Sequence, residues 1–377
     1  MKNPFKYGKR VSGSAFFDRI KIKKDIQNIL DGGNNVLLYG PRRFGKSSLV
    51  GEVLSEIRAR GGICAELNLM DVASLDDFVS KFARSVYREL APVSGALNLV
   101  TGFFRRISPS VGLDGEGKPE LRLAFRSGRA TVETLREVLQ LPEKLCGGDR
   151  QIVIALDEFQ EATELGLGAQ FERTMRSVIE TQEHVSYIFL GSKTHLLERM
   201  FASKSRPFYN SAQKLLLRKP PADESAEFLV NRFASVGITL EGRLADKMVG
   251  RIGNVPYYLQ ALGSWTFNCI RERESVQVSE SDVEEGFASL YETERILLED
   301  TFRAHSETQR LLMRALASEP IARFDEAYRL RHGLPSTSTV NTALRRLLAD
   351  STVEKSASGY SLADPLLVWH LVQTAER

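Results

Sequence analysis

A stretch near the N-terminus has the residue types and the spacing that bind phosphate. Residues 40–47, Gly-Pro-Arg-Arg-Phe-Gly-Lys-Ser, match the pattern G-x-x-x-x-G-K-[ST] and follow the apolar run Val-Leu-Leu-Tyr without a gap. The glycines allow a tight turn in which successive N–H groups point at phosphate oxygens, and the following helix adds its positive N-terminal end. Lys46 is expected to reach the β- and γ-phosphates, and the Ser47 hydroxyl to ligate Mg²⁺. The predicted nucleotide-binding residues are Gly40, Pro41, Arg42, Arg43, Phe44, Gly45, Lys46, Ser47 and Ser48.

A second stretch supplies two carboxylates at the end of an apolar run. Residues 152–158 read Ile-Val-Ile-Ala-Leu-Asp-Glu. Asp157 is expected to hold Mg²⁺ through water, and Glu158 to polarise the water that attacks the γ-phosphorus. A single acid at a strand end is commonly only a solvated turn. This pair, in a chain that also has a phosphate-binding loop (P-loop), predicts hydrolysis of ATP to ADP and phosphate, with ATP, ADP and Mg²⁺ as ligands.

The composition is that of a soluble globular chain. It has 377 residues, 42% hydrophobic and 26% charged, which predicts two or three domains. A net charge of +3 does not suit a nucleic-acid polycation, so local charge must decide that question. Cys64, Cys146 and Cys269 lie far apart, which disfavours a structural zinc site or a disulfide framework and fits a reducing cytoplasm. No secretory signal and no apolar run near ~18 residues is present, so we expect a cytoplasmic protein without a membrane span.

The first half of the chain alternates predicted strands and helices. Strands are predicted at 35–39, 63–69, 151–159 and 185–192, with amphipathic helices between them. This alternation indicates an α/β fold with a mostly parallel sheet, here a P-loop NTPase core. Residues 105–128 interrupt the rhythm: Leu121, Leu123 and Phe125 alternate with Arg122, Ala124 and Arg126, which predicts an inserted β-hairpin.

The second half is predicted to be helical. Residues 219–302 carry helix patterns only, as in an all-helical lid domain, and residues 303–377 read helix (307–318), helix (324–332), helix (338–349) and hairpin. That order predicts a C-terminal winged helix. The predicted division is a basic arm with the first helix (1–34), an ATPase core (35–218), the lid (219–302) and the winged helix (303–377).

Two basic segments could contact nucleic acid. In helix 338–349, an apolar stripe that includes Val340 and Leu344 leaves other side chains free to meet a major groove and its phosphates. These predicted DNA contacts are Asn341, Thr342, Arg345 and Arg346, with Lys355 and Tyr360 on or near the wing. Residues 1–24 hold eight Lys or Arg against one acid, which is either a DNA-binding arm or a solvated terminus.

Taken in order, these segments resemble the archaeal-type P-loop ATPases of the AAA+/STAND assemblage, relatives of origin-recognition and replication-loader ATPases. The resemblance covers nearly the whole chain. It is carried by Phe-Phe-Asp-Arg at 16–19, LLYGPRRFGKSSL at 37–49, IVIALDEFQE at 152–161, YIFLGS at 187–192, GNVPYYLQ at 253–260 and the predicted winged helix.

The resemblance implies further roles around the nucleotide. Ser192 falls at the sensor-one position and would sense the γ-phosphate, although a serine at a strand end also occurs without that role. Pro256 lies in a GxP motif whose proline packs against adenine; a proline that merely begins a helix would look the same. Phe17 and Arg19 match the segment that borders the base.

An arginine that reaches the γ-phosphate is implied at Arg206, acting in cis or from a neighbouring copy, with Arg199 and Lys204 as competitors. Lys46, Glu158, Ser192 and Arg206 are thus the predicted catalytic residues. The chain departs from the typical pattern because the lid lacks an obvious sensor-two arginine, for which Arg251 is only a candidate. This departure favours slow, switch-like hydrolysis.

Three functions remain open at this point. The first is an ATP-dependent switch that binds duplex DNA through the winged helix and the basic arm. The second is a STAND-type signalling ATPase, in which the winged helix contacts a protein partner or holds the chain inactive. A nucleotide-dependent homo-oligomer is compatible with both. The third, a DNA-independent motor, is disfavoured because no aromatic pore-loop motif is evident.

Overall fold

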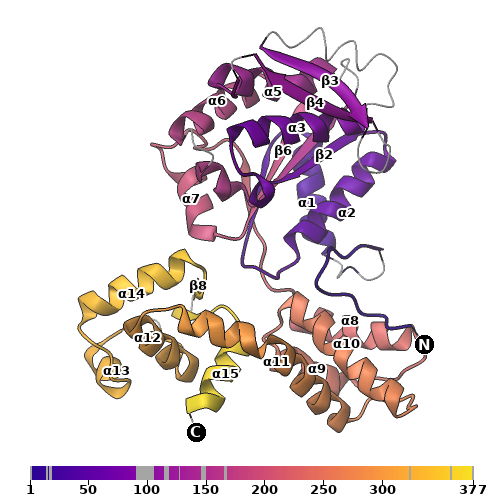
Figure 1. Cartoon of the computed structure of the whole chain (residues 1–377). Helices are drawn as coiled ribbons and strands as arrows, with labels where there is room; N and C mark the ends of the chain where they lie inside the picture. The colour runs from indigo at the N-terminus through magenta and orange to yellow at the C-terminus, as the bar shows by residue number, and fades with distance from the viewer. Residues whose placement is uncertain are drawn as a thin grey trace. The chain divides into compact units, whose positions relative to one another are not determined.

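The computed structural model describes most of the chain (Figure 1). The described residues are 2–13, 16, 19–90, 106–113, 119–126, 128–145, 150–164, 168–321, 324–356 and 359–375. They form two compact units. One contains Arg19–Gly40 and Lys46–Leu217, and the other contains Met1–Asp18, Pro41–Gly45 and Arg218–Arg377.

The first unit is built on a five-stranded parallel sheet in the order β2-β5-β6-β1-β7. Its strands are β1 (Val36–Tyr39), β2 (Ile63–Asn68), β5 (Ile152–Asp157), β6 (Val185–Gly191) and β7 (Gln213–Leu216). Strands β1 and β6 are buried along their whole length, as in sheets covered on both faces. The predicted parallel α/β core is therefore confirmed. The sequence pattern does not predict β7, because this short edge strand is mostly exposed and has little apolar signal.

Helices cover both faces of this sheet. Helices α1 (Ile20–Asp31) and α2 (Lys46–Ala59) pack together on one face. The large core on the other face is closed by α3 (Leu75–Leu90), α5 (Val132–Leu145), α6 (Ala169–Ile179) and α7 (Thr194–Ala202), with the short 3-10 helices η2 (Leu69–Asp71) and η3 (Phe159–Glu164). Fully buried aromatic rings such as Phe78, Phe171 and Phe189 fill this core. Burial on this scale holds the strand ends in fixed positions.

The predicted inserted hairpin is present. Strands β3 (Ile107–Leu113) and β4 (Pro119–Phe125) pair antiparallel as a separate two-stranded sheet. Leu121 is buried, and its carbonyl accepts a hydrogen bond from Arg84 Nε of α3 at 3.1 Å. The hairpin therefore packs on the first unit through one apolar side.

The second unit begins with four helices in the region predicted to be a helical lid. They are α8 (Ala222–Ala234), α9 (Gly242–Arg251), α10 (Pro256–Glu272) and α11 (Glu280–Arg303). Helix α11 starts with a capping box, in which Ser279 and Asp282 satisfy each other's backbone N–H groups.

The start of the basic arm is anchored in this second unit. The Phe5 ring is buried and lies edge-on to Phe233, with centroids 4.9 Å apart. Asn3 Nδ2 donates to Ser264 Oγ at 2.9 Å, and the Lys6 N–H donates to Gln260 Oε1 at 3.2 Å. Residues 3–6 are therefore held in place although Lys6 is exposed, and both predicted roles of the arm stay open.

The last elements form a winged-helix arrangement. Helices α12 (Glu307–Ser318), α13 (Glu326–Arg331) and α14 (Thr337–Ala349) precede the hairpin β8 (Val353–Ser356) and β9 (Gly359–Leu362), and α15 (Pro365–Ala375) ends the described chain. The three predicted helices and the wing are confirmed. Helix α15 is not predicted, because the segment Pro-Leu-Leu-Val-Trp-His-Leu-Val is too uniformly apolar to show a helical period.

The lid and the winged helix fall in one compact unit, so the finer boundary at residue 302 stays a prediction. Among the helices of the described ranges, none combines the length and apolar character that a membrane crossing requires.

The contact between α10 and α11 leads to a stability prediction. A Cβ on Gly286 would lie 2.7 Å from the Thr266 backbone nitrogen, which cannot move without shifting α10. We expect Gly286→Ala to destabilise the second unit by about 1–3 kcal/mol through overpacking. Gly250→Ala is the control, because a Cβ there meets nothing within 4 Å and the change should slightly stabilise α9. Thermal unfolding of both variants tests this, and equal midpoints would contradict it.

Candidate active site

The site is assembled at the carboxyl edge of the parallel sheet. Strand β1 leads into Gly40, β5 ends at Asp157, and β6 is followed by Ser192. Because β5 pairs with β6 and β6 with β1, these three strand ends are neighbours on one edge. A Cβ on Gly40 would lie 2.6 Å from the Leu217 carbonyl oxygen, so only glycine fits where the chain leaves the sheet.

Lys46 is a buried cation at the start of α2. Its side chain is 7% exposed, and Nζ donates to the Gly40 carbonyl oxygen at 2.7 Å. The ammonium group is thus folded back across the loop that precedes it. Within that loop, Phe44 is buried and Arg42 is exposed. The arrangement combines a positive charge with the N-terminal end of a helix, which suits an anion.

Two oxygen ligands meet beside this loop. Ser47 Oγ donates to Asp157 Oδ2 at 2.6 Å, although the residues are far apart in sequence. A hydroxyl and a carboxylate are ligands that Mg²⁺ accepts, and this ion usually takes its other ligands from water and substrate phosphates. Within the described ranges no group of three or more His, Cys, Asp or Glu could hold a metal. The pair therefore fits a cation that shares a phosphate ligand rather than a protein cage.

The Glu158 carboxylate is held by three donors. Its Oε2 accepts from Ser192 Oγ at 3.0 Å, from the Ser192 N–H at 3.3 Å and from Gln160 Nε2. The Glu158 backbone has φ +50, a left-handed conformation that costs energy for a residue other than glycine. The structure thus brings together Glu158 and Ser192, which the sequence placed on separate strands.

Gln160 is a site residue that sequence reasoning missed. It is 3% exposed, lies in η3 and donates from Nε2 to both Glu158 and Glu161. The sequence shows only that Gln160 follows Glu158 by two residues. This spacing does not predict that the Gln160 side chain turns back to bond Glu158. A buried amide at this point restricts where the Glu158 carboxylate can move.

Arg206 lies in an ion pair within the first unit. Its guanidinium contacts Glu172 of α6, whose side chain is only 1% exposed. Burial raises the pKa of Glu172, and the charge of Arg206 opposes that rise. Arg199 of α7 and Lys204, the two predicted competitors, are exposed. In this structure Arg206 therefore neutralises a buried carboxylate.

The segment 253–257 has the features of a helix start. Pro256 is the first residue of α10, and Asn254 has φ +56, with Nδ2 donating to the Pro220 carbonyl at 2.7 Å. The Tyr257 N–H donates to the Arg43 carbonyl oxygen of the P-loop at 3.2 Å. Pro256 thus begins a helix, and its contact with adenine stays a prediction. Arg19 lies directly before α1, and Phe17 lies outside the described residues.

Arg251, the sensor-two candidate, is engaged within the second unit. Its guanidinium carbon lies 4.3 Å from the Phe287 ring centroid, and Nη2 pairs with Glu284 at 3.2 Å. Both partners belong to α11. The Arg251 side chain thus joins α9 to α11.

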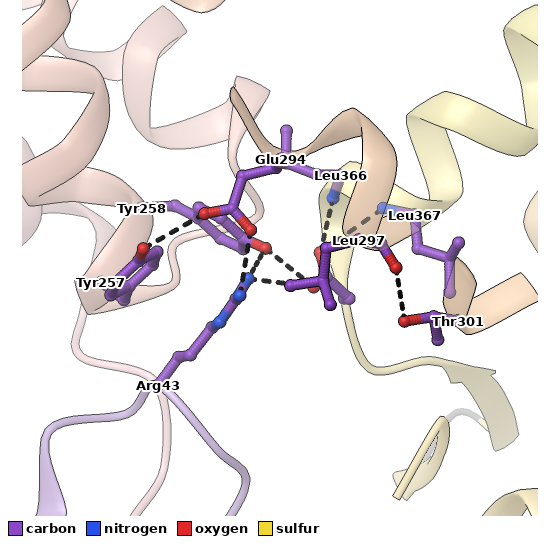
Figure 2. Close-up of polar contacts among 9 residues, drawn as sticks. Arg43, Tyr257, Tyr258, Glu294, Leu297, Thr301, Leu366 and Leu367 are labelled. Atoms are coloured by element: carbon purple, nitrogen blue, oxygen red, sulfur yellow. Dashed lines mark hydrogen bonds and ion pairs between the residues drawn. The ribbon is translucent and has the colours of Figure 1, made fainter. Parts of the chain in front are cut away.

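The Arg43 side chain contacts two acids and two tyrosines. Figure 2 shows its side chain extending from the loop toward Tyr257, Tyr258 and Glu294. Nη2 pairs with Glu294 Oε2 at 3.0 Å, and Nη1 pairs with Asp364 Oδ2 at 3.2 Å and with Tyr258 Oη. Burial raises the pKa of Asp364, and Arg43 opposes the rise. The predicted phosphate-loop residue Arg43 is therefore bound by acids of α11 and of the segment before α15.

Helix α14 presents the predicted nucleic-acid contacts on one exposed face. Val340, Leu344 and Leu347 are buried. Ala343 is also buried and Leu348 is half-buried, whereas Asn341, Thr342, Arg345 and Arg346 are exposed. In the wing, Lys355 lies over the Tyr360 ring, 5.7 Å from its centroid. The geometry leaves a polar, cationic helix face available to a partner.

Comparisons with known proteins agree with the fold. Residues 22–188 match the family described as AAA ATPase domain, and residues 279–373 match the one described as probable winged helix domain. No curated protein matches the sequence.

Solved structures share the fold at low identity. The Walker-type ATPase PABY2304 of Pyrococcus abyssi superposes with a TM-score of 0.71 at 18% identity, covering 98% of this chain and 99% of that one. The ORC2 protein of Aeropyrum pernix in its ADPNP–ADP complexes superposes with a TM-score of 0.59 at 15% identity, covering 95% of each chain. The fold is therefore that of archaeal ORC-like ATPases with a C-terminal winged helix.

The Arg206–Glu172 pair leads to a prediction on stability and pH. Arg206→Met leaves a buried carboxylate without its partner, which costs ~3 kcal/mol at pH 7.5. The pKa of Glu172 in the folded variant then lies still further above its unfolded value, so the carboxyl stabilises the fold when protonated and loses that contribution as pH rises. The deficit relative to the parent should therefore shrink at pH 5.

Thermal unfolding at both pH values measures this effect. The expected loss at pH 7.5 is roughly 6–12 °C for a unit of this size. Arg173→Met, at an exposed position of α6 whose charge does not act on the pKa of Glu172, is the control and should shift the midpoint little. A variant Arg206→Met that melts with the parent at both pH values would show that the pair does not support the fold.

Proposed function

Starting from a chain that joins an AAA ATPase domain to a winged helix domain, we propose that it is a nucleotide-dependent switch that binds and slowly hydrolyses ATP and binds duplex DNA. One observation carries the ATPase part. Lys46, the Ser47–Asp157 pair and the Glu158–Ser192 pair all lie where neighbouring parallel strands end. Ligands of open α/β sheets bind at that edge.

Each side chain has a defined task in this proposal. The P-loop backbone and Lys46 bind the β- and γ-phosphates, and Ser47 and Asp157 hold Mg²⁺, which would neutralise charge developing on the phosphoryl oxygens. Glu158 orients the attacking water, and Ser192 contacts the γ-phosphate. Around the base, the proposed contacts are Pro256, Phe17 and Arg19.

The hold on Glu158 supports slow turnover. Because Ser192 and Gln160 donate to Oε2, they fix the orientation of the carboxylate and leave Oε1 to accept a hydrogen bond from water. A γ-phosphate that engages Ser192 would remove two of these donors. Hydrolysis then waits for a rearrangement of the site, as suits a switch. In this proposal Arg206 reaches a γ-phosphate only after leaving Glu172.

DNA binding is proposed at the exposed face of α14 and along the basic arm. Asn341 and Thr342 offer hydrogen bonds to bases, and Arg345 and Arg346 offer charge to phosphates. The arm supports this role, because Phe5 fixes it on the second unit while Lys2, Lys6 and Lys9 remain exposed. A held row of cations loses less entropy on binding than a mobile one.

A second candidate has its own observation. Asp364, at the start of the last helix of the winged helix, pairs with Arg43 of the P-loop. A winged helix tied to the nucleotide loop is also what a STAND-type signalling ATPase would use to hold itself inactive and to contact a protein partner or another copy. Under this candidate, nucleotide exchange controls protein binding and duplex DNA is not a ligand.

Two substitutions test the ATPase site. We expect Lys46→Ala to abolish detectable binding of ATP and ADP, because the buried ammonium contributes the charge that phosphate meets. Glu158→Gln should retain binding and lose turnover by ~100-fold or more, because an amide cannot polarise water as a carboxylate does. Calorimetry measures binding, and phosphate release measures turnover.

The exposed changes Lys24→Ala and Glu183→Gln are matched controls and should behave as the parent does. Parental turnover in Glu158→Gln would remove this residue from the water-orienting role. Parental affinity in Lys46→Ala would place the phosphates elsewhere.

A gel shift with duplex DNA separates the two candidate functions. We expect ATP-dependent binding that weakens steeply between low and moderate salt through counterion release. The variant Arg345→Glu/Arg346→Glu should lose it, whereas Arg243→Glu/Arg271→Glu, with the same charge change on exposed lid positions, should retain it. Unchanged binding in the first variant excludes α14 as the DNA contact. No shift with any duplex favours the STAND-type candidate.

A further inference from the structure

The backbone of the P-loop is held from outside at Arg43. This residue lies three positions before Lys46 and has φ +67, a backbone conformation that residues other than glycine rarely adopt. Its carbonyl oxygen accepts from the Tyr257 N–H at 3.2 Å. A strained conformation of this kind persists only where surrounding contacts fix it.

The side chains of Arg43, Tyr257 and Glu294 each contact the other two. Tyr257 Oη donates to Glu294 Oε1 at 3.1 Å, while the other oxygen of Glu294 accepts from Arg43. The guanidinium carbon also lies 4.7 Å from the Tyr257 ring centroid and 4.9 Å from that of Tyr258. The main chain of Arg43 bonds to Tyr257, and its side chain, drawn in Figure 2, contacts Tyr257 as well.

The two acids that bind Arg43 come from helices distant in sequence. Glu294 lies in the middle of α11, and its side chain is only 10% exposed. Asp364 directly precedes α15 and divides its oxygens: Oδ1 accepts from the Leu366 N–H at 2.9 Å, and Oδ2 accepts from Arg43 and from Tyr258 Oη. The same carboxylate therefore caps α15 and holds the P-loop.

We propose that Glu294 and Asp364 are positioning residues for the nucleotide, which act through Arg43 to hold the P-loop in its phosphate-binding shape. The inference rests on the proposed function, because it requires that the P-loop binds nucleotide. It adds two residues that do not belong to the phosphate-binding motif and lie more than 200 positions after it.

Coupling in the opposite direction follows from thermodynamic linkage. If the start of α15 and the middle of α11 favour the phosphate-binding shape of the loop, a bound nucleotide must favour the Arg43–Asp364 contact by the same factor. Occupancy of the P-loop thereby stabilises the N-terminal turn of α15. Nucleotide binding thus affects the winged helix through Arg43 and Asp364.

The test measures nucleotide affinity in variants that keep the other contacts of each acid. Glu294→Gln retains an oxygen for Tyr257 Oη, and Asp364→Asn retains an oxygen for the α15 cap, while each loses its charge toward Arg43. With MgADP and calorimetry on the full chain, we expect Kd to rise about 10- to 100-fold in each variant, since a hydrogen bond to a charged group is lost. Glu292→Gln, an exposed acid of α11 paired with Arg295, is the matched control and should keep the parental Kd.

A double-mutant cycle separates positioning from a general loss of structure. If both acids act through Arg43, Asp364→Asn should raise Kd no further once Arg43→Gln is present. Hydrogen exchange supplies a second measurement, because MgADP should slow exchange in α15 of the parent and leave α15 unchanged in Arg43→Gln. Parental Kd values in Glu294→Gln and Asp364→Asn, or additive effects in the cycle, would overturn the inference. If the parent itself binds no nucleotide, the proposed function fails first.

Discussion

A parallel sheet delivers the carboxyl ends of its strands to one edge, and the candidate site depends on this constraint. Because β5, β6 and β1 are neighbours, the loop after Gly40, the acids after β5 and Ser192 after β6 are brought together. The buried aromatic core beneath the sheet fixes these strand ends. Polar groups with separate origins in the chain can then form contacts such as Ser47–Asp157 at 2.6 Å.

Two of the proposed catalytic residues already have partners in the first unit. Glu158 is held by the neutral donors Ser192 and Gln160, and Arg206 pairs with the buried Glu172. In the proposed reaction, Ser192 exchanges Glu158 for the γ-phosphate and Arg206 leaves Glu172, and each exchange adds to the barrier for turnover. This is the physical basis for proposing a switch rather than a fast enzyme.

In the second unit, Arg43 performs a similar function for the phosphate-binding loop. Its cation is shared between two acids, Glu294 and Asp364, and two aromatic rings. Since α11 runs from the lid region to the winged helix and Asp364 caps α15, one guanidinium contacts both parts of this unit. Under the proposal, nucleotide binding at the P-loop and the N-terminal turn of α15 influence each other through this contact.

The sequence by itself determined the features that depend on local patterns. The P-loop motif, the acids after an apolar strand, the parallel α/β core, the inserted hairpin and the winged-helix order could all be predicted, because each is encoded within a few neighbouring residues. The short exposed strand β7 and the uniformly apolar α15 could not, since neither has a period to detect. Only the tertiary structure decided that Gln160 restrains Glu158, that Arg206 pairs with Glu172 and that Arg43 pairs with Asp364, which lies 321 residues away. Such partners are chosen by packing between distant elements, and no local pattern records which side chains that packing will bring within hydrogen-bond distance.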